Sequence, residues 1–200
     1  MDERTRIAAW PFEVDPVHFF AWAEGVFTKQ ECEKIIKLAT KQIAVESQVG
    51  FGKAKSRTDR SLRISKVRWI SPSDEFDWVF RKITDVTTML NDKFFKFDLF
   101  GAMEGLQFTS YKGPGGKYGK HVDRNHGGII RKLSLTVQLS DPKKYEGGDL
   151  CLYDSDKPSL GSKKQGGVVV FPSFVQHEVR PVTKGQRYSL VAWITGKPFK

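Results

Sequence analysis

The second half of the chain alternates short strand-like segments with turn signals, and this pattern constrains the fold more than any other feature. Runs rich in Val, Leu, Phe, Tyr and Thr favour strands, and the Gly- and Pro-containing stretches between them favour turns. The expected strands are 105–111, 132–140, 149–153, 167–171, 177–182 and 187–195, with a turn at 183–185 before the last of them. We therefore expect a β body over about residues 97–196 that closes as a jelly roll, or double-stranded β-helix.

Two helices are expected to support this body. Thr28 and Glu31 have the spacing of a capping box. Apolar residues then follow at helical period, namely Cys32, Ile35, Ile36, Ala39 and Ile43. Ser71 and Pro72 are typical of a second helix start, ahead of an apolar stripe from Phe76 to Phe94. The fold class is therefore α+β, mainly β, as a single domain over residues 1–200.

The stretch between the two expected helices contains a loop and a strand. Residues 46–61 are polar, basic and glycine-containing, so they form either a lid or binding loop or a solvated linker. Residues 61–70 alternate like a strand, but the phase slips before Val67, which a bulge would explain.

Composition narrows the cellular setting. The formal net charge of +10 fits either a basic soluble surface or an acidic or nucleic-acid partner. No apolar run is long enough to span a bilayer, and the N-terminal residues lack the apolar core of a secretory signal. Cys32 and Cys151 have no metal-type spacing and indicate a reducing compartment. We expect a cytoplasmic protein without a membrane segment, and the sequence leaves a monomer and a homodimer open.

Three side chains are candidate ligands of one metal ion. His121 and Asp123 are two residues apart, which on a strand directs both side chains to the same face. His177, late in the chain beside another apolar run, is the best third candidate. Two His and one carboxylate form the facial set that leaves open positions on Fe(II). The sequence therefore predicts an iron site at His121, Asp123 and His177.

The expected strand at 132–140 has two unlike faces. Leu133, Leu135, Val137 and Leu139 form an apolar face, which we expect to lie under the helices. Ser134, Thr136 and Gln138 form a polar face, which suits the inside of a barrel that holds a polar ligand. A half-exposed surface strand is the alternative.

Arg187 lies in the last expected strand, ten residues after His177. A buried guanidinium is costly unless it meets an anion. A dicarboxylate ligand would supply that anion through a bidentate pair, and a local Asp or Glu is the alternative partner.

Together these residues resemble the Fe(II)/2-oxoglutarate-dependent dioxygenases, and more closely their prolyl 4-hydroxylase-like branch. The resemblance covers roughly residues 20–196. Its motif residues are Tyr111, Tyr118, His121 and Asp123 in a Y-x6-Y-x2-H-x-D arrangement, His177, Arg187 ten residues later, and Trp193 six residues after Arg187. Residues 133–150 resemble the central strand of the branch and its G-G-[DE]-L turn.

The resemblance implies a role for each motif residue. His121, Asp123 and His177 would hold Fe(II) as the catalytic centre, and Arg187 would bind the far carboxylate of 2-oxoglutarate. Tyr111 would hydrogen-bond the cosubstrate, with Thr136, Gln138 and Trp193 lining its pocket. Gln138 occupies the position nearest to a Tyr that many relatives carry. Ascorbate is a further cofactor that the branch allows.

The resemblance also implies a prolyl residue of a peptide or protein as substrate. The candidate substrate contacts are Tyr118, Arg131 and Arg57, the last within the basic loop 46–61. Three alternatives stay open: the same chemistry on a nucleic acid, the same chemistry on a free amino acid, and a non-enzymatic jelly-roll binding module. The nucleic-acid demethylases of the superfamily carry a second Arg where this chain has Trp193, which argues against that alternative.

Overall fold

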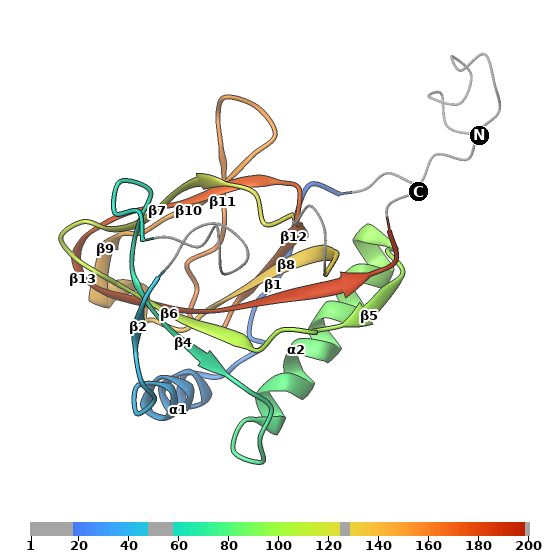
Figure 1. The fold of residues 1–200 in the computed structure, drawn as a ribbon, viewed down its shortest axis with the longest axis horizontal. Helices are drawn as coiled ribbons and strands as arrows, with labels where there is room; N and C mark the ends of the chain where they lie inside the picture. The colour runs from blue at the N-terminus through green and yellow to red at the C-terminus, as the bar shows by residue number, and fades with distance from the viewer. Residues whose placement is uncertain (1–17, 48–57, 125–128, 199–200) are drawn as a thin grey trace.

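The computed structural model describes residues 18–47, 58–124 and 129–198, which form two layers of antiparallel strands with helices against one of them (Figure 1). The main layer has the strand order β1-β12-β8-β13-β6-β4-β2. Its strands are β1 (Ala21–Ala23), β12 (Val168–Pro172), β8 (Arg131–Gln138), β13 (Gln176–Gly196), β6 (Leu106–Lys112), β4 (Lys66–Ile70) and β2 (Val45–Glu46), and β5 (Leu99–Gly101) pairs with the end of β13.

The second layer is built on the first half of β13. That half pairs with β10 (Leu150–Tyr153), β7 (Gly116–His121) and β9 (Tyr145–Gly147). Two short strands complete the layer: β11 (Ser159–Leu160) beside β10, and β3 (Arg63–Ile64) beside β7. β13 therefore belongs to both layers and joins them, as expected for a sheet that rolls onto itself.

The prediction of a turn at 183–185 is wrong, because β13 is one continuous strand of 21 residues. Its register shifts between Val182 and Lys184 where it passes β9. Gly185 has φ +74°, and a Cβ there would lie 2.2 Å from the carbonyl oxygen of Lys144. The Thr-Lys-Gly stretch is thus an irregularity inside a strand, where a glycine permits close approach of two backbones.

The first expected helix is confirmed and the start of the second is not. α1 (Lys29–Ala39) begins with the predicted capping box of Thr28 and Glu31, but Ile43 lies beyond it and is 88% exposed. α2 (Asp77–Leu90) begins six residues after Ser71, because the backbone amides of Phe76 and Asp77 bond the carbonyl of Ser73 and close a turn first. A π-helical turn, η2 (Asn91–Phe95), follows α2, and a short 3-10 helix, η3 (Pro142–Lys144), precedes β9. None of the described helices is long and apolar enough to cross a membrane.

The phase slip that we expected as a bulge in residues 61–70 has another cause. β3 pairs with β7 in the second layer, whereas β4 pairs with β6 and β2 in the main layer. Ser65 lies between the two strands, so the chain changes layers there. Within β3 and within β4, the side chains then alternate between the two faces without a bulge.

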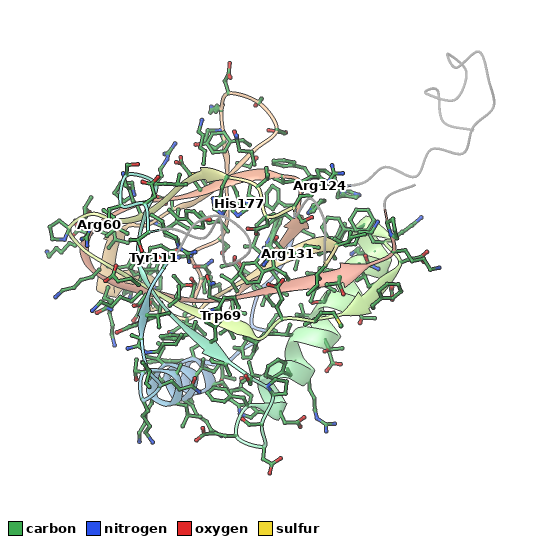
Figure 2. All side chains as sticks on the ribbon, in the orientation of Figure 1. Arg60, Trp69, Tyr111, Arg124, Arg131 and His177 are labelled. Carbon is green, nitrogen blue, oxygen red and sulfur yellow. The ribbon has the colours of Figure 1, made fainter. Side chains whose placement is uncertain are left out.

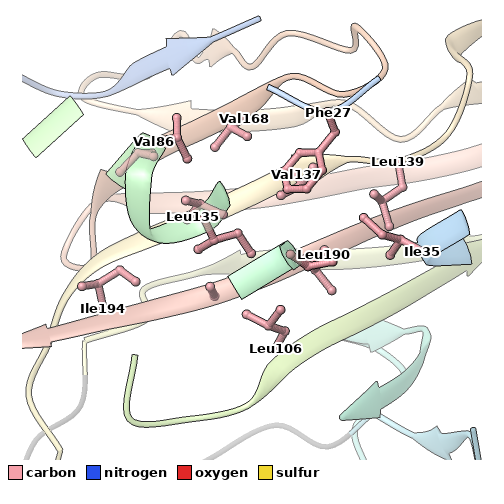
Figure 3. Close-up of a cluster of buried hydrophobic side chains, with 14 of the residues drawn as sticks. Phe27, Ile35, Val86, Leu106, Leu135, Val137, Leu139, Val168, Leu190 and Ile194 are labelled. Carbon is pink, nitrogen blue, oxygen red and sulfur yellow. The ribbon is translucent and has the colours of Figure 1, made fainter. Parts of the chain in front are cut away.

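The main hydrophobic core lies between the helices and the outer face of the main layer (Figure 3). Leu133, Leu135, Val137 and Leu139 of β8 are fully buried in it, which confirms the predicted apolar face of this strand. Burial of each such side chain contributes about 1.5–3 kcal/mol. The opposite, polar face of β8 therefore has to point between the two layers.

Candidate active site

His121, Asp123 and His177 lie together in the space between the layers (Figure 2 labels His177). β7 ends at His121, which pairs with His177 of β13. We had expected Asp123 to lie on the same strand as His121, but it follows just beyond the end of β7. Its carboxylate oxygens lie 3.6 Å from His121 Nε2 and 3.5 Å from His177 Nε2. One ligand atom of each residue lies within 4.8 Å of the others, so the three can share one ion.

Backbone carbonyls fix the orientation of both imidazole rings. His121 Nδ1 lies 2.8 Å from the carbonyl oxygen of Gly119, and His177 Nδ1 lies 3.0 Å from that of Val175. A carbonyl only accepts, so each Nδ1 carries the proton and donates it. Both Nε2 lone pairs are then left to bind a cation, which is the usual arrangement of metal-ligating histidines.

Asp123 is held from two sides. Ser134 Oγ donates to its Oδ2 at 2.7 Å, and its backbone amide donates to the carbonyl of Ser173 at 3.0 Å. Burial, the largest single effect, raises the pKa of Asp123, but the two histidines and Ser134 together lower it to about 2. Burial, followed by the charge of His177, lowers the pKa of His121 to about 3. At neutral pH the site therefore holds an ionised carboxylate and a neutral His121, the forms that bind metal.

A stack of two side chains, Tyr118 and Arg63, supports His121 from one side. The Tyr118 ring lies over the His121 ring with centroids 3.5 Å apart and planes at 17°. The guanidinium of Arg63 lies 4.3 Å from the centroid of the Tyr118 ring. Arg63 is buried, and it donates to Gln107 Oε1 at 2.8 Å and to Ser65 Oγ at 3.0 Å. Sequence reasoning missed Arg63; an Arg in a strand that is otherwise half apolar was the available signal.

Arg187 forms a second polar cluster in the same cavity. It is 1% exposed and donates to Gln138 Oε1 at 2.9 Å and to Ser189 Oγ at 3.3 Å. The ring of Tyr111 lies with its centroid 5.4 Å from the guanidinium carbon. Arg187 forms no ion pair within the described ranges, and its Nε has no hydrogen-bond partner there. The local Asp or Glu that we considered as its partner is therefore absent from this part of the chain.

One cavity connects the metal cluster with the Arg187 cluster. Its lining includes all three candidate ligands, Arg187, Tyr111, Tyr118, Thr136 and Trp193. Gln138 is not among the lining residues and reaches the cavity only through its hydrogen bond to Arg187. The predicted polar face of β8 thus points inward, with Ser134 at the metal cluster and Thr136 in the lining.

Arg131, one of the candidate substrate contacts, lies beside this cavity. It forms a bidentate pair with Glu104, with both distances at 2.6 Å, and stacks 4.0 Å from the centroid of the Trp193 ring. Trp69 lies 6.0 Å from Trp193, centroid to centroid, and is 45% exposed (Figure 2). An aromatic path therefore leads from the cavity to the surface. Arg57, the remaining candidate contact, lies outside the described residues.

The residues present fit both Fe(II) and a dicarboxylate. Two neutral imidazoles and one carboxylate form a donor set that suits Fe(II). Arg187 Nε and Gln138 Nε2 are buried donors without a partner among the described residues. Buried polar groups normally have partners, so unpaired donors around a guanidinium indicate a site for an anion.

The chain is similar in sequence to known 2-oxoglutarate/Fe(II) oxygenases, which agrees with the residues found in this site. A sequence profile described as the 2OG-Fe(II) oxygenase superfamily matches residues 106–195. A PKHD-type hydroxylase of Verminephrobacter eiseniae is 36% identical over 91 residues, which cover 42% of this chain and 40% of that protein. The match thus spans less than half of the length of this relative.

Two solved structures share the fold. A prolyl-4-hydroxylase of Pseudomonas putida superposes with a TM-score of 0.70 at 20% identity, covering 90% of this chain and 94% of that chain. A prolyl hydroxylase of Trichoplax adhaerens, in complex with a hypoxia inducible factor oxygen degradation domain peptide fragment, gives 0.72 at 19% identity, covering 89% and 84%. These structures confirm the mainly β double-stranded β-helix. The profile match confirms the resemblance to the 2-oxoglutarate/Fe(II) oxygenases over residues 106–195.

Proposed function

We propose that this chain, whose residues 106–195 match the 2OG-Fe(II) oxygenase superfamily, is a dioxygenase that hydroxylates a prolyl residue of a peptide or protein. The main observation behind this proposal is that the metal cluster and the Arg187 cluster lie in one cavity. His121, Asp123 and His177 converge at one of them, and a buried guanidinium without a carboxylate partner in the described chain forms the other.

Each cluster has a distinct task in this proposal. His121, Asp123 and His177 would hold Fe(II), and Arg187 would bind the distal carboxylate of 2-oxoglutarate through a charge-assisted pair. When bound, the iron and cosubstrate would supply the oxidation, in which substrate, O2 and 2-oxoglutarate yield hydroxylated substrate, succinate and CO2. Ser134 and the two backbone carbonyls keep the ligands oriented, and the apolar lining limits access of water.

The prolyl substrate is supported by the names of the relatives and by the surroundings of the cavity. A PKHD-type hydroxylase and two prolyl hydroxylases are among the similar proteins. Trp69 and Trp193 give an aromatic path on which a proline ring can pack, as in other modes of proline recognition. Arg131, Tyr118 and Arg63 are the polar contacts that we propose for the backbone of the bound segment.

The direct test is a turnover assay with product analysis. The protein is incubated with Fe(II), 2-oxoglutarate, O2 and proline-containing peptides, and succinate is measured together with the mass of the peptide. We expect stoichiometric succinate and one added oxygen atom on proline. Succinate that appears only with nucleic acid or free amino acids would overturn the substrate class, and a lack of Fe(II)-dependent succinate with all substrates would overturn the activity.

We also propose conditions and a setting for this activity. Ascorbate would sustain turnover, which is tested by omitting it from the assay. Cys32 and Cys151 are both buried and free, which fits work in the reducing cytoplasm. Cell fractionation and light scattering would test the location and whether the protein is a monomer or a homodimer.

A further inference from the structure

A second concave region lies on the opposite face of the strands that line the active site. Side chains alternate between the faces of a strand. On β6, Gln107 and Tyr111 line the active-site cavity, whereas Ser110 and Lys112 line a groove of about 340 Å³ on the other face. The groove lies next to the C-terminal end of α1, at Thr40, and its volume is in the range of sites that bind small ligands or short peptide segments.

The charge of this groove is unbalanced. Four of its lining residues are cations, namely Arg60, Lys66, Arg68 and Lys112, and Glu46 is its one acidic residue. Within residues 18–47, 58–124 and 129–198, none of the four cations forms an ion pair. Arg68 is half-buried, and its one hydrogen bond in these ranges runs from Nε to the carbonyl of Gln42 at 3.0 Å. Such a concentration of uncompensated positive charge favours an anionic ligand.

The cations form a row along the strands rather than a single cluster. Lys66 pairs with Ser110, Arg68 pairs with Phe108, and Lys112 lies two residues beyond Ser110. The three cations therefore occupy successive same-face levels, each about 6.6 Å apart at about 3.3 Å per residue. The row spans about 13 Å, too long for one carboxylate or phosphate. An extended peptide presents its alternate side chains with the same repeat.

The surroundings of the row favour a peptide over a nucleic acid. Glu46 would repel a continuous run of phosphates but can lie beside a neutral residue of a peptide. Ile43 directly follows Gln42, whose carbonyl accepts a hydrogen bond from Arg68, and its side chain is 88% exposed, so an apolar residue of a peptide bound beside Arg68 can pack on it. Tyr188 and Ser110 in the lining add hydroxyl groups that can bond a peptide backbone.

We propose that this groove binds an extended acidic peptide segment, with carboxylates at alternate positions, outside the active site. Under the proposed function, on which this part of the inference rests, the segment belongs to the protein substrate and lies away from its target proline. The second contact raises the effective concentration of the proline at the iron site. The binding step itself needs neither iron nor 2-oxoglutarate.

The test measures peptide binding without turnover. A fluorescent ten-residue peptide with Glu at alternate positions, separated by Ser and one Val, is titrated with metal-free protein and followed by anisotropy. The comparison peptides carry Gln in place of each Glu, or the same number of Glu in one block. We expect the alternating Glu peptide to bind at least tenfold more tightly than the Gln peptide, and the affinity to fall as salt rises.

Matched charge variants separate the groove from the net charge. Lys66→Gln/Lys112→Gln removes two exposed groove cations, and Lys143→Gln/Lys157→Gln removes two exposed cations elsewhere. We expect the groove pair to lose about tenfold in affinity and the control pair less than twofold. Equal losses in both pairs would overturn the proposal. Tighter binding of a twelve-nucleotide single strand, with the same sensitivity to the groove pair, would assign the groove to nucleic acid instead.

A turnover arm distinguishes this inference from the proposed function. Lys66→Gln/Lys112→Gln should leave succinate formation with a short neutral proline peptide unchanged, and should raise the KM of the same peptide extended by the acidic segment by about tenfold. If no peptide is turned over, the anisotropy result still decides the groove. If turnover occurs but the acidic extension has no effect on KM or on binding, the groove proposal is wrong and the activity stands.

Discussion

The two ends of the active-site cavity are both buried and polar, but they are built differently. At the metal end, His121 and Asp123 lie where β7 ends, and backbone carbonyls and Ser134 set their orientation. At the other end, Arg187 and Gln138 come from the interiors of β13 and β8, which pair directly. The metal end is therefore positioned by hydrogen bonds to nearby backbone carbonyls and to Ser134 of β8, and the anion end by the register of the sheet.

This difference indicates where each end tolerates change. The loss of one of these hydrogen bonds at the metal end should loosen a ligand without disturbing the sheet. At the anion end, Arg187 is a buried cation without an ion pair in the described chain, so the protein bears a desolvation cost that a bound anion would offset. We expect variants at the two ends to separate iron binding from 2-oxoglutarate binding.

The largest expected effect comes from His177→Ala. One of three ligands is lost, and we expect succinate formation to fall on the order of a thousandfold, equal to about 4 kcal/mol of transition-state stabilisation. Iron content after dialysis should fall in parallel. His18→Ala removes an imidazole outside the cavity and should retain full activity. Normal iron content in the His177 variant would contradict the assignment of the metal end.

Arg187→Met should produce the next largest effect, confined to the anion end. We expect the KM for 2-oxoglutarate to rise about a hundredfold, because the distal carboxylate of 2-oxoglutarate loses the buried guanidinium with which we propose that it pairs. Iron affinity in the absence of 2-oxoglutarate should change by less than about threefold, since the hydrogen bonds of Arg187 in the described chain go to Ser189 and Gln138 and not to the ligand set.

The stability of the Arg187 variant sharpens the same contrast. Without cosubstrate, removal of the unpaired charge offsets the lost hydrogen bonds, so the free energy of unfolding should change by less than about 1 kcal/mol. Stabilisation by added 2-oxoglutarate should disappear in thermal melts. Arg180→Met, an exposed change on the same strand, serves as the control and should keep that stabilisation.

The sequence predicted the metal end and the anion end for different physical reasons. The prediction of His121, Asp123 and His177 rests on spacing and chemistry, and that of the inward face of β8 rests on strict alternation between Leu133 and Leu139. Asp123 lies just beyond the end of β7, so its position does not follow from strand spacing, whereas the alternation along β8 is local geometry that tertiary contacts did not override. The capping box at Thr28 succeeded for the same reason.

Other features depend on contacts that a pattern does not contain. Arg63 enters the site because the chain changes layers at Ser65, and a two-residue strand is too short to give a periodic signal. The support of Asp123 by Ser134 joins residues on different elements, so no spacing predicts it. The late start of α2 reflects a turn closed by Ser73, which competes with an otherwise good N-cap at Ser71.

Ser134→Ala should have a smaller effect, directed at the metal end. Asp123 keeps its charge but loses the hydrogen bond that orients it, so we expect iron affinity to fall about tenfold, within the usual range for such supporting groups. The KM for 2-oxoglutarate should change less. Ser189→Ala, the matched change beside Arg187, should give the reverse pattern. Identical effects of the two variants on both ligands would mean that the two ends do not act separately.

Gln138→Leu should have the smallest effect and tests how the anion end is organised. Gln138 Oε1 accepts from Arg187, so its loss removes one hydrogen bond that orients the guanidinium. A hydrogen bond to a charged group contributes about 1.5–3 kcal/mol, but here the freed donor can bind the cosubstrate instead, so we expect the KM for 2-oxoglutarate to rise only about threefold to tenfold. Iron affinity should stay the same. An effect as large as that of Arg187→Met would mean that the unpaired Nε2 of Gln138 binds the cosubstrate directly, and that the anion end has two ligands rather than one.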